Sequence, residues 1–209
     1  MIITYFGKEF FKIQHGDTVI ALNPVSKDSK LKSSRFGADI ALISVNHEDY
    51  NGADLVSFGE KIPFVISGPG EYETKGIFIK GIPSESSAGG NKKINTIYTL
   101  SVDKMNICFL GAISSKNLPV ESREAIDGVD ILFVPIGGEG VLNPSDAYSI
   151  AVSIEPKVII PMDYADETVL KKFLKEGGAE KTEILEKFTV KQKDIEEMEG
   201  EIVVLAPSV

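Results

Sequence analysis

Short apolar runs separated by polar turns fill the first half of the chain. The first runs alternate apolar and polar side chains, which is typical of strands that bury one face. "IITYFG", "EFFKIQ" and "TVIALN" are divided by the turns "GK" and "HGD", so the pattern predicts a β-meander over residues 2–23. This segment has no basic region and no small-residue cleavage site, so it is expected to be structural rather than a signal peptide. Further strands are predicted over residues 38–45, 64–68, 76–82, 95–102 and 105–111.

Polar segments between these strands are predicted to be turns and loops. "LKSSRFG" at residues 31–37 is expected to be a polar connection, and "PSESSAGGNKK" at residues 83–93 a flexible loop. "GPGEYE" at residues 68–73 lacks the G-x-x-x-x-G-K-[ST] pattern, and its acidic side chains would repel phosphate, so a tight turn is expected. At "PIGG", residues 135–138, glycine is expected to allow a close backbone approach at the end of a buried strand.

The second half of the chain alternates strands and helices. The spacing of apolar residues predicts helices over residues 118–126, 143–156 and 166–180. Ser145 is the expected N-cap of the second helix and Pro156 follows its end, while Gly177 and Gly178 terminate the third. Buried or closing strands are predicted over residues 129–136, 157–162, 184–195 and 200–207.

The number and order of these elements indicate the fold class. About thirteen strands and three helices, with no linker long enough to divide them, predict a single domain over residues 1–209. An α/β (α+β) fold is expected, in which two sheets pack together and helices cover the outer faces. The strand–helix alternation late in the chain argues against a pure β-sandwich.

Charge and composition narrow the classes of partner. The 209-residue chain has a formal net charge of −9, whereas nucleic acids and anionic membranes bind basic surfaces. No apolar run approaches the roughly 18 residues of a membrane span. The single cysteine, Cys108, lies in the apolar run "NICFLG" and is expected to be a buried structural thiol. These features favour a cytoplasmic protein, with a small-molecule partner left open.

Five segments carry a resemblance to a known family. They are "ADIALISVNHEDYNG", "ISGPGEYETKGIFIKGI", "INTIYTLSVDKMNICFLGA", "VDILFVPIGG" and "AYSIAVSIEPKVIIPMDY". In this order they resemble the metallo-β-lactamase superfamily, and more narrowly its compact branch of lactonase-like and proposed zinc-dependent hydrolases. The resemblance covers essentially the whole chain. It implies a four-layer αββα sandwich of two mixed sheets, with a metal site built from loops at one edge of the sheets.

The first departure from the family pattern follows the buried strand. The resemblance implies the motif H-x-H-x-D-H there, in which the histidines and the aspartate hold metal ions. In "SVNHEDYNG", Val45 and Tyr50 replace the first and last histidines, while His47 and Asp49 match the other two ligands. Valine offers no lone pair, and a neutral tyrosine is a poor substitute for imidazole. The metal site is therefore expected to be degenerate.

Later departures fall on further metal-site positions. Ala112 stands in "FLGAIS" where the family has a bridging aspartate, and Asp163 stands in "PMDY" where it has a histidine. Asn23–Pro24 replaces an Asp-Pro pair. A two-metal hydrolase site needs a bridging carboxylate between cations about 3.5–4 Å apart. A dinuclear zinc centre of the usual kind is therefore not expected.

A weak, residual set of ligands remains in His47, Asp49 and Asp163. One nitrogen and several oxygens would suit a single divalent ion, either Zn²⁺, Mn²⁺, Mg²⁺ or Ca²⁺. Asp49 would be catalytic only if such a metal is bound, and no other cofactor is expected. Without a metal, His47 would be hydrogen-bonded between Asp49 and Asp163 or a backbone carbonyl. Side chains expected to support these residues are Glu48, Tyr50, Glu71 and Tyr164.

Two functional hypotheses follow, and whether the chain is an enzyme stays open between them. The favoured one is a binding or structural protein that keeps the metallo-β-lactamase fold but has lost the dinuclear zinc site and hydrolysis. The alternative is a single-metal hydrolase of a small ester, lactone or phosphoester that uses His47, Asp49 and Asp163. A Ser114 or Ser115 nucleophile has little support, because no G-x-S-x-G elbow is present. Exposed sheet edges leave a homo-oligomer open.

Overall fold

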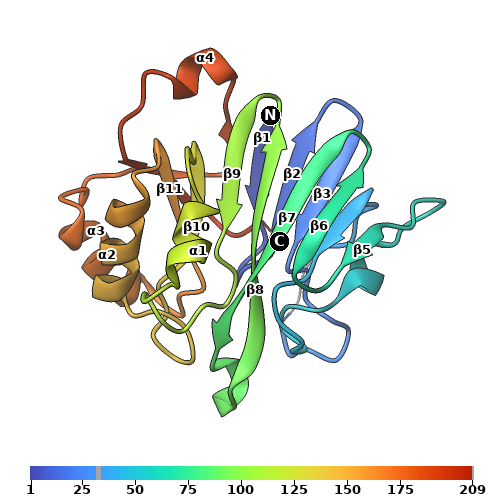
Figure 1. Ribbon diagram of the computed structural model, residues 1–209, viewed down its shortest axis with the longest axis horizontal. Helices are drawn as coiled ribbons and strands as arrows, with labels where there is room; N and C mark the ends of the chain where they lie inside the picture. Colours follow the sequence, from blue (N-terminus) through green and yellow to red (C-terminus); the bar gives the residue numbers. More distant parts are fainter. Residues whose placement is uncertain (32–33, 209) are drawn as a thin grey trace.

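Two mixed β-sheets packed face to face form the centre of the computed structural model, which describes residues 1–31 and 34–208 (Figure 1). The first sheet has the strand order β13-β1-β2-β3-β4-β5. Strands β1, β2 and β3 are antiparallel, which confirms the predicted meander, and β4 and β5 continue the sheet in parallel. The strand bounds are Ile2–Tyr5 (β1), Phe11–His15 (β2), Thr18–Leu22 (β3), Ile40–Leu42 (β4), Phe64–Ile66 (β5) and Phe188–Thr189 (β13).

The second sheet has the strand order β14-β11-β10-β9-β8-β7-β6. Strands β6 to β9 are antiparallel neighbours, whereas β9, β10, β11 and β14 run parallel. A separate parallel pair joins β12 (Ile184–Leu185) to β15 (Val204–Leu205). The strand bounds are Gly70–Thr74 (β6), Ile77–Ser86 (β7), Lys93–Val102 (β8), Met105–Phe109 (β9), Ile131–Pro135 (β10), Val158–Met162 (β11) and Glu201–Ile202 (β14).

Large apolar side chains from both sheets fill the space between them. Phe133 of β10 packs edge to face on Phe11 of β2, with ring centroids 4.8 Å apart. Within β3, Ile20 and Leu22 belong to this central core, whereas Ala21 belongs to a separate cluster on the outer face. This alternation of side chains is what a strand with two buried faces requires. The sheets and their helices confirm the predicted metallo-β-lactamase-like fold class.

Helices cover the outer face of the second sheet, on the left of Figure 1. They are α1 (Val120–Glu124), α2 (Pro144–Ile154) and α3 (Glu167–Glu176). Ile150 and Phe173 from α2 and α3 pack with Leu132 of β10. The outer face of the first sheet is covered more thinly, by the 3-10 helix η1 (Ala53–Val56) and Phe36. No helix among the described residues is long and apolar enough to cross a membrane.

The N-terminus of α2 differs from its prediction. Asn143 rather than Ser145 is the N-cap, and its side-chain oxygen accepts a hydrogen bond from the Asp146 N–H at 3.0 Å. Pro144 then occupies the first turn, where its missing N–H costs nothing because that donor has no helical partner. An Asn-Pro pair is therefore a stronger start signal than the serine that follows it.

The segment over residues 83–93 is a hairpin rather than a flexible loop. Ser84 pairs with Asn95 and Ser86 with Lys93, so β7 and β8 continue almost to the tip. The 3-10 helix η2 (Ala88–Gly90) closes the hairpin. The polar composition of this hairpin reflects the exposure of most of its side chains to solvent. Its backbone groups are nevertheless hydrogen-bonded between the two strands.

Several other strands are shorter than predicted. The segment over residues 184–195 contains β12, β13 and the helix α4 (Gln192–Ile195) instead of one strand. The strand expected over residues 38–45 is reduced to β4, and only the start of residues 68–73 turns before β6 begins. Part of the polar connection expected over residues 31–37 falls on Lys32 and Ser33, which lie outside the described residues.

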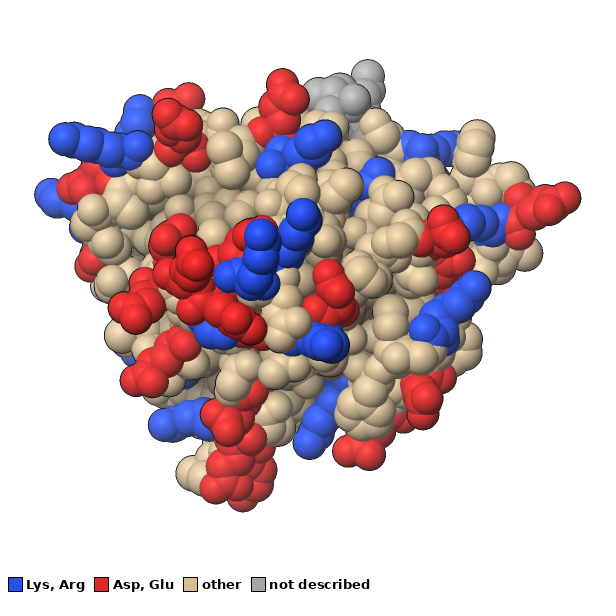
Figure 2. Space-filling model, turned by 90° about the horizontal axis from the view of Figure 1, so that it is seen from above, with Lys and Arg blue, Asp and Glu red and all other residues tan. Residues whose placement is uncertain are grey.

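The end of the molecule that carries α4 is shown in Figure 2. Lysine and arginine side chains are interspersed there with aspartate and glutamate, and acidic side chains gather toward one side. The exposed glutamates 196, 197 and 199 follow α4 at this end. The opposite end of the sheets carries the candidate site.

Candidate functional site

The carboxyl ends of the parallel strands β9, β10 and β11 meet at one edge of the second sheet and point toward the bottom of Figure 1. The tip of the β7–β8 hairpin lies at the same end. The segment after β4 joins them, because Val45 and Tyr50 pack with Ala112, which follows β9. This edge is where the family resemblance implies a metal centre.

A buried apolar cluster occupies this edge. Val45 and Tyr50 pack with Ala88, Ala112 and Val141, and each of these side chains is at most 6% exposed. Three of them stand at positions where the family pattern has metal ligands. Alkyl groups packed at this density offer no lone pair and leave little room for a hydrated cation. The departures noted in the sequence therefore gather in one place.

Asp163 lies beside this cluster and has two partners. The Lys8 ammonium is 2.5 Å from Asp163 Oδ1, and the Tyr50 hydroxyl donates to Oδ2 at 2.8 Å. Asp163 is only 4% exposed and has a φ of 54°, in the left-handed region. The Asp163 N–H donates to the Lys8 carbonyl at 2.7 Å, which holds this backbone close to the turn after β1. Both carboxylate oxygens are thus engaged by protein groups.

The protonation of these partners follows from their surroundings. Burial lowers the pKa of Lys8, but the carboxylate of Asp163 outweighs it, and the net pKa is raised. Burial raises the pKa of Tyr50 far above its ordinary range. Lys8 is therefore a cation and Tyr50 a neutral donor, so one full positive charge and one O–H compensate the Asp163 carboxylate.

A second buried network surrounds Glu9. The Asn23 amide donates to Glu9 Oε2 and to the Ser44 hydroxyl, each at 2.7 Å, and the Ser44 N–H donates to Asn23 Oδ1. Glu9 is fully buried, and its Oε1 has no hydrogen-bond partner among the described residues. Burial, followed by the nearby charge of Asp163, raises the pKa of Glu9 well above its ordinary value. The neutral acid is the form that this site favours.

Replacing Glu9 with glutamine tests this protonation state through stability. A raised folded-state pKa means that the unfolded chain loses its proton first, so wild-type stability falls as pH rises above about 4.5. Glu9→Gln cannot ionise, so its stability relative to wild type should increase with pH above that value and match wild type below it. Urea unfolding at several pH values measures the difference. Glu71→Gln, at an exposed site on β6, should show no such trend.

His47 has its hydrogen-bond partner in Asp49. Its Nδ1 accepts a hydrogen bond from the Asp49 N–H at 3.2 Å, while the Asp49 carboxylate is 3.9 Å from the same nitrogen. The amide contact has hydrogen-bond length and decides the tautomer, so a neutral His47 carries its proton on Nε2. A Cβ placed on Gly89 would be 2.9 Å from this Nε2, which locates it at the hairpin tip. Asp49 thus contacts His47 through its backbone N–H, whereas the Asp163 carboxylate is engaged by Lys8 and Tyr50.

The other predicted site residues are dispersed. Asp49 Oδ1 accepts a hydrogen bond from the Ser29 hydroxyl at 2.5 Å. Glu48 and Glu71 are exposed, and Glu71 faces Lys80 across β6 and β7. Tyr164 packs against the helix-side core, where burial raises its pKa. Among the described residues, no three His, Cys, Asp or Glu side chains are placed to share a metal ion.

The serine alternative also receives no geometric support. The Ser114 hydroxyl donates to the Glu85 carbonyl at 3.3 Å, and Ser115 accepts from the Asn117 N–H. Neither hydroxyl is hydrogen-bonded to His47 in the described part of the chain. Cys108 is fully buried, as expected, and burial raises the pKa of its thiol.

Lys8 and Glu9 are the site residues that the sequence reasoning missed. They stand in the turn "GKE" between β1 and β2, where polar residues are ordinary. One signal was available, because Glu9 directly precedes the apolar pair Phe10 and Phe11 in a segment that is buried throughout. A carboxyl group at such a position needs a buried polar partner.

Comparisons with known proteins agree with this fold. The family profile described as "Beta-lactamase superfamily domain" matches residues 2–163. A metal-dependent hydrolase from Listeria monocytogenes is 25% identical, over 78% of this chain and 85% of the relative. A solved structure of a proposed zinc-dependent hydrolase of the metallo-β-lactamase superfamily, from Thermotoga maritima, is 25% identical with a TM-score of 0.79, and covers 98% of this chain and 97% of its own. A proposed metal-dependent hydrolase from Parabacteroides distasonis, 17% identical with a TM-score of 0.68 over 99% and 93% of the two chains, shares the fold.

Proposed function

The chain belongs to the β-lactamase superfamily, and from that premise we propose that it uses the fold for binding and has lost the metal-dependent hydrolytic chemistry. Relatives at about a quarter identity are named metal-dependent hydrolases. The question for this site is therefore whether its side chains could bind a divalent metal.

The observation that carries the proposal is the Lys8 ammonium 2.5 Å from Asp163. Asp163 stands at a ligand position of the family pattern, and a metal ion there would need one of its oxygens. A lysine cation beside that oxygen repels a second cation, and at about 4 Å like charges cost several kcal/mol at a protein-like dielectric constant. The donor set fits an internal ion pair and does not fit a divalent metal.

The apolar cluster supports the same proposal from a second direction. Val45 and Ala112 replace a histidine and a bridging aspartate and are buried against each other. Filling that volume with alkyl groups stabilises the fold, since buried apolar surface contributes about 25 cal/mol per Å². A chain that had lost only one ligand would keep a polar hole at this place.

The single-metal alternative would use His47, Asp49 and Asp163. For His47 to bind a metal through Nε2, it would have to move its proton to Nδ1 and lose the hydrogen bond from the Asp49 N–H. Asp163 would also have to exchange Lys8 or Tyr50 for the metal. These two rearrangements weigh against this function.

Metal analysis tests the proposal directly. The full chain, expressed with added zinc and manganese and purified without chelators, should contain no stoichiometric transition metal by elemental analysis. Its Tm should not rise with Zn²⁺ or fall with a chelator, because a metal raises Tm only if it binds the folded state more tightly than the unfolded state. His47→Ala should leave the metal content unchanged. A stoichiometric metal with metal-dependent hydrolysis of an ester, lactone or phosphoester would overturn the proposal.

A further inference from the structure

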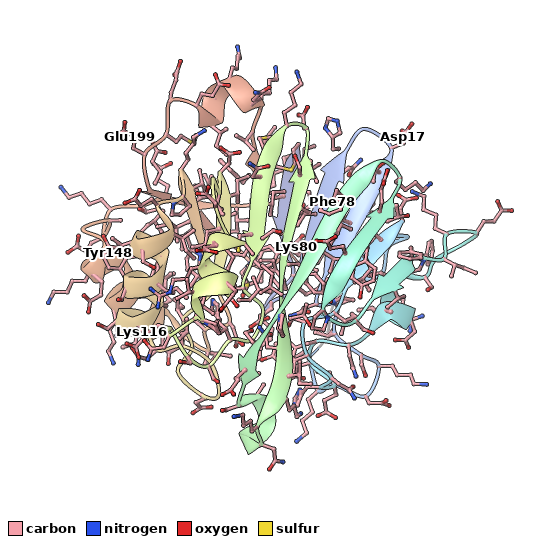
Figure 3. The ribbon with its side chains drawn as sticks, in the orientation of Figure 1. Asp17, Phe78, Lys80, Lys116, Tyr148 and Glu199 are labelled. Atoms are coloured by element: carbon pink, nitrogen blue, oxygen red, sulfur yellow. The ribbon has the colours of Figure 1, made fainter. Side chains whose placement is uncertain are left out.

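A two-part groove runs along the β7–β8 hairpin beside the degenerate site. The larger part, about 680 Å³, has mostly apolar walls and lies between the hairpin and the loop after β9. Lys116 belongs to this loop and lies at the lower left of Figure 3, on the side of the helices. The apolar residues of the walls are Pro69, Pro83, Ile94, Ile113, Leu118 and Pro119. A volume of this size suits a small organic molecule.

Several polar side chains border the smaller part of the groove. It measures about 420 Å³ and is lined by Ser44, Asn46, Ser67 and Thr96. Both parts share Pro69, Lys93 and Ile94, so Lys93 stands at their junction. Ile94 is 70% exposed, which is high for an isoleucine on a paired strand. An apolar surface next to a lysine is the pattern expected for a ligand with an apolar body and an anionic end.

The Lys93 ammonium is the nitrogen donor at this junction. A Cβ placed on Gly89, in the hairpin tip, would lie 3.6 Å from Lys93 Nζ but only 2.9 Å from His47 Nε2, so the His47 ring fills the space beside Gly89. His47 lines neither part of the groove, whereas Lys93 lines both. An ammonium with three N–H donors beside apolar walls suits a carboxylate.

Lys93 differs from its neighbour Lys92 in its partners. The Lys92 ammonium is 2.6 Å from Glu85, and its side chain is 75% exposed. Lys93 is half-buried and has no carboxylate within 4 Å among the described residues. The chain has a net charge of −9, so most of its surface repels anions. The Lys93 ammonium, without a carboxylate partner in the described part of the chain, can attract one anionic group to the groove junction.

We propose that the groove binds a small organic monocarboxylate, with its carboxylate at Lys93 Nζ and its apolar body along Ile94 and Leu118. This inference rests on the proposed binding function and names the class of ligand. The acidic net charge disfavours polyanions such as polyphosphates, because a single lysine cannot offset their repulsion by the remainder of the surface.

The experiment compares two probes of the same shape. Calorimetric titration of the full chain, with a chelator present, measures binding of 4-phenylbutyrate and of the neutral 4-phenylbutan-1-ol. The carboxylate should bind at least about ten-fold more tightly, since a charge-assisted hydrogen bond contributes roughly 1.5–3 kcal/mol. Equal affinity of the two probes, or binding of neither, would overturn the proposal.

Matched variants locate the binding. Lys93→Met should lower the affinity for 4-phenylbutyrate about ten-fold and leave the alcohol unchanged, while Lys171→Met, at an exposed lysine that does not line the groove, should change neither. Ile94→Ser should weaken both probes. These residues lie at the surface, and unchanged Tm values would show that the variants fold. An equal loss from Lys171→Met and Lys93→Met would reject the assignment to Lys93.

This test separates its own failure from that of the proposed function. Binding that requires added metal, together with a stoichiometric metal in the purified chain, would overturn the proposed loss of metal chemistry. A metal-free chain that binds both probes equally would overturn only the carboxylate site.

Discussion

Lys8→Met should destabilise the protein by about 2–3 kcal/mol, because removing the partly exposed lysine leaves a buried carboxylate without its compensating charge. Asp163 is 5% exposed at its side chain and keeps the Tyr50 hydroxyl and the neighbouring Glu9, but no cation among the described residues, once the ammonium is gone. Methionine fills a similar volume, so the loss measures charge rather than packing. Urea unfolding at neutral pH gives the difference in the free energy of unfolding.

An exposed pair in the same chain provides the control. Lys171 is 3.0 Å from Glu167, with side chains 73% and 78% exposed, so Lys171→Met should cost less than about 0.5 kcal/mol. Adding Asp163→Asn to Lys8→Met should recover part of the lost stability, since it removes the stranded charge. A Lys8→Met variant as stable as Lys171→Met would contradict the idea that Lys8 serves as the internal cation of this site.

Much of the fold could be predicted because its determinants are local. Phe11 and Ile13 of β2 face the core, whereas Lys12 and Gln14 do not, and this period of two is visible in the sequence. The hairpin over residues 83–93 was missed because its composition resembles a loop, while its structure depends on pairing along two long strands. Polar composition reports exposure, and it does not report whether the backbone is paired.

The site was only half predictable, because its decisive contact joins distant parts of the chain. The positions Val45, Ala112 and Asp163 could be identified from motifs, so the loss of metal ligands was foreseeable. That a lysine from the first turn would reach Asp163 could not be, since no local pattern relates Lys8 to a residue more than a hundred positions later. Long-range electrostatic partners become visible only when the sheets are packed.

Close packing of backbone explains why the site edge tolerates few changes. Gly137, at the "PIGG" end of β10, would place a Cβ 2.1 Å from the Asp163 carbonyl oxygen. This confirms the predicted close backbone approach. The chain at the end of β10 therefore packs directly against the backbone of Asp163. The position of the Asp163 carboxylate relative to Lys8 therefore depends on a glycine that never contacts either side chain group.

Gly137→Ala should consequently destabilise the protein by about 3 kcal/mol, at the upper end of the range for added methyl groups in packed regions. The clash is with backbone, which cannot change rotamer, so β10 and the Asp163 turn have to separate. Gly68→Ala is the matched control, because its Cβ would meet nothing within 4 Å, and it should change stability by less than about 0.5 kcal/mol. Urea unfolding measures both. If Gly137→Ala also moves Asp163, then adding Lys8→Met to it should cost less than Lys8→Met costs alone, since the ion pair would already be weakened. Additive losses would mean that the strand end and the ion pair are energetically independent.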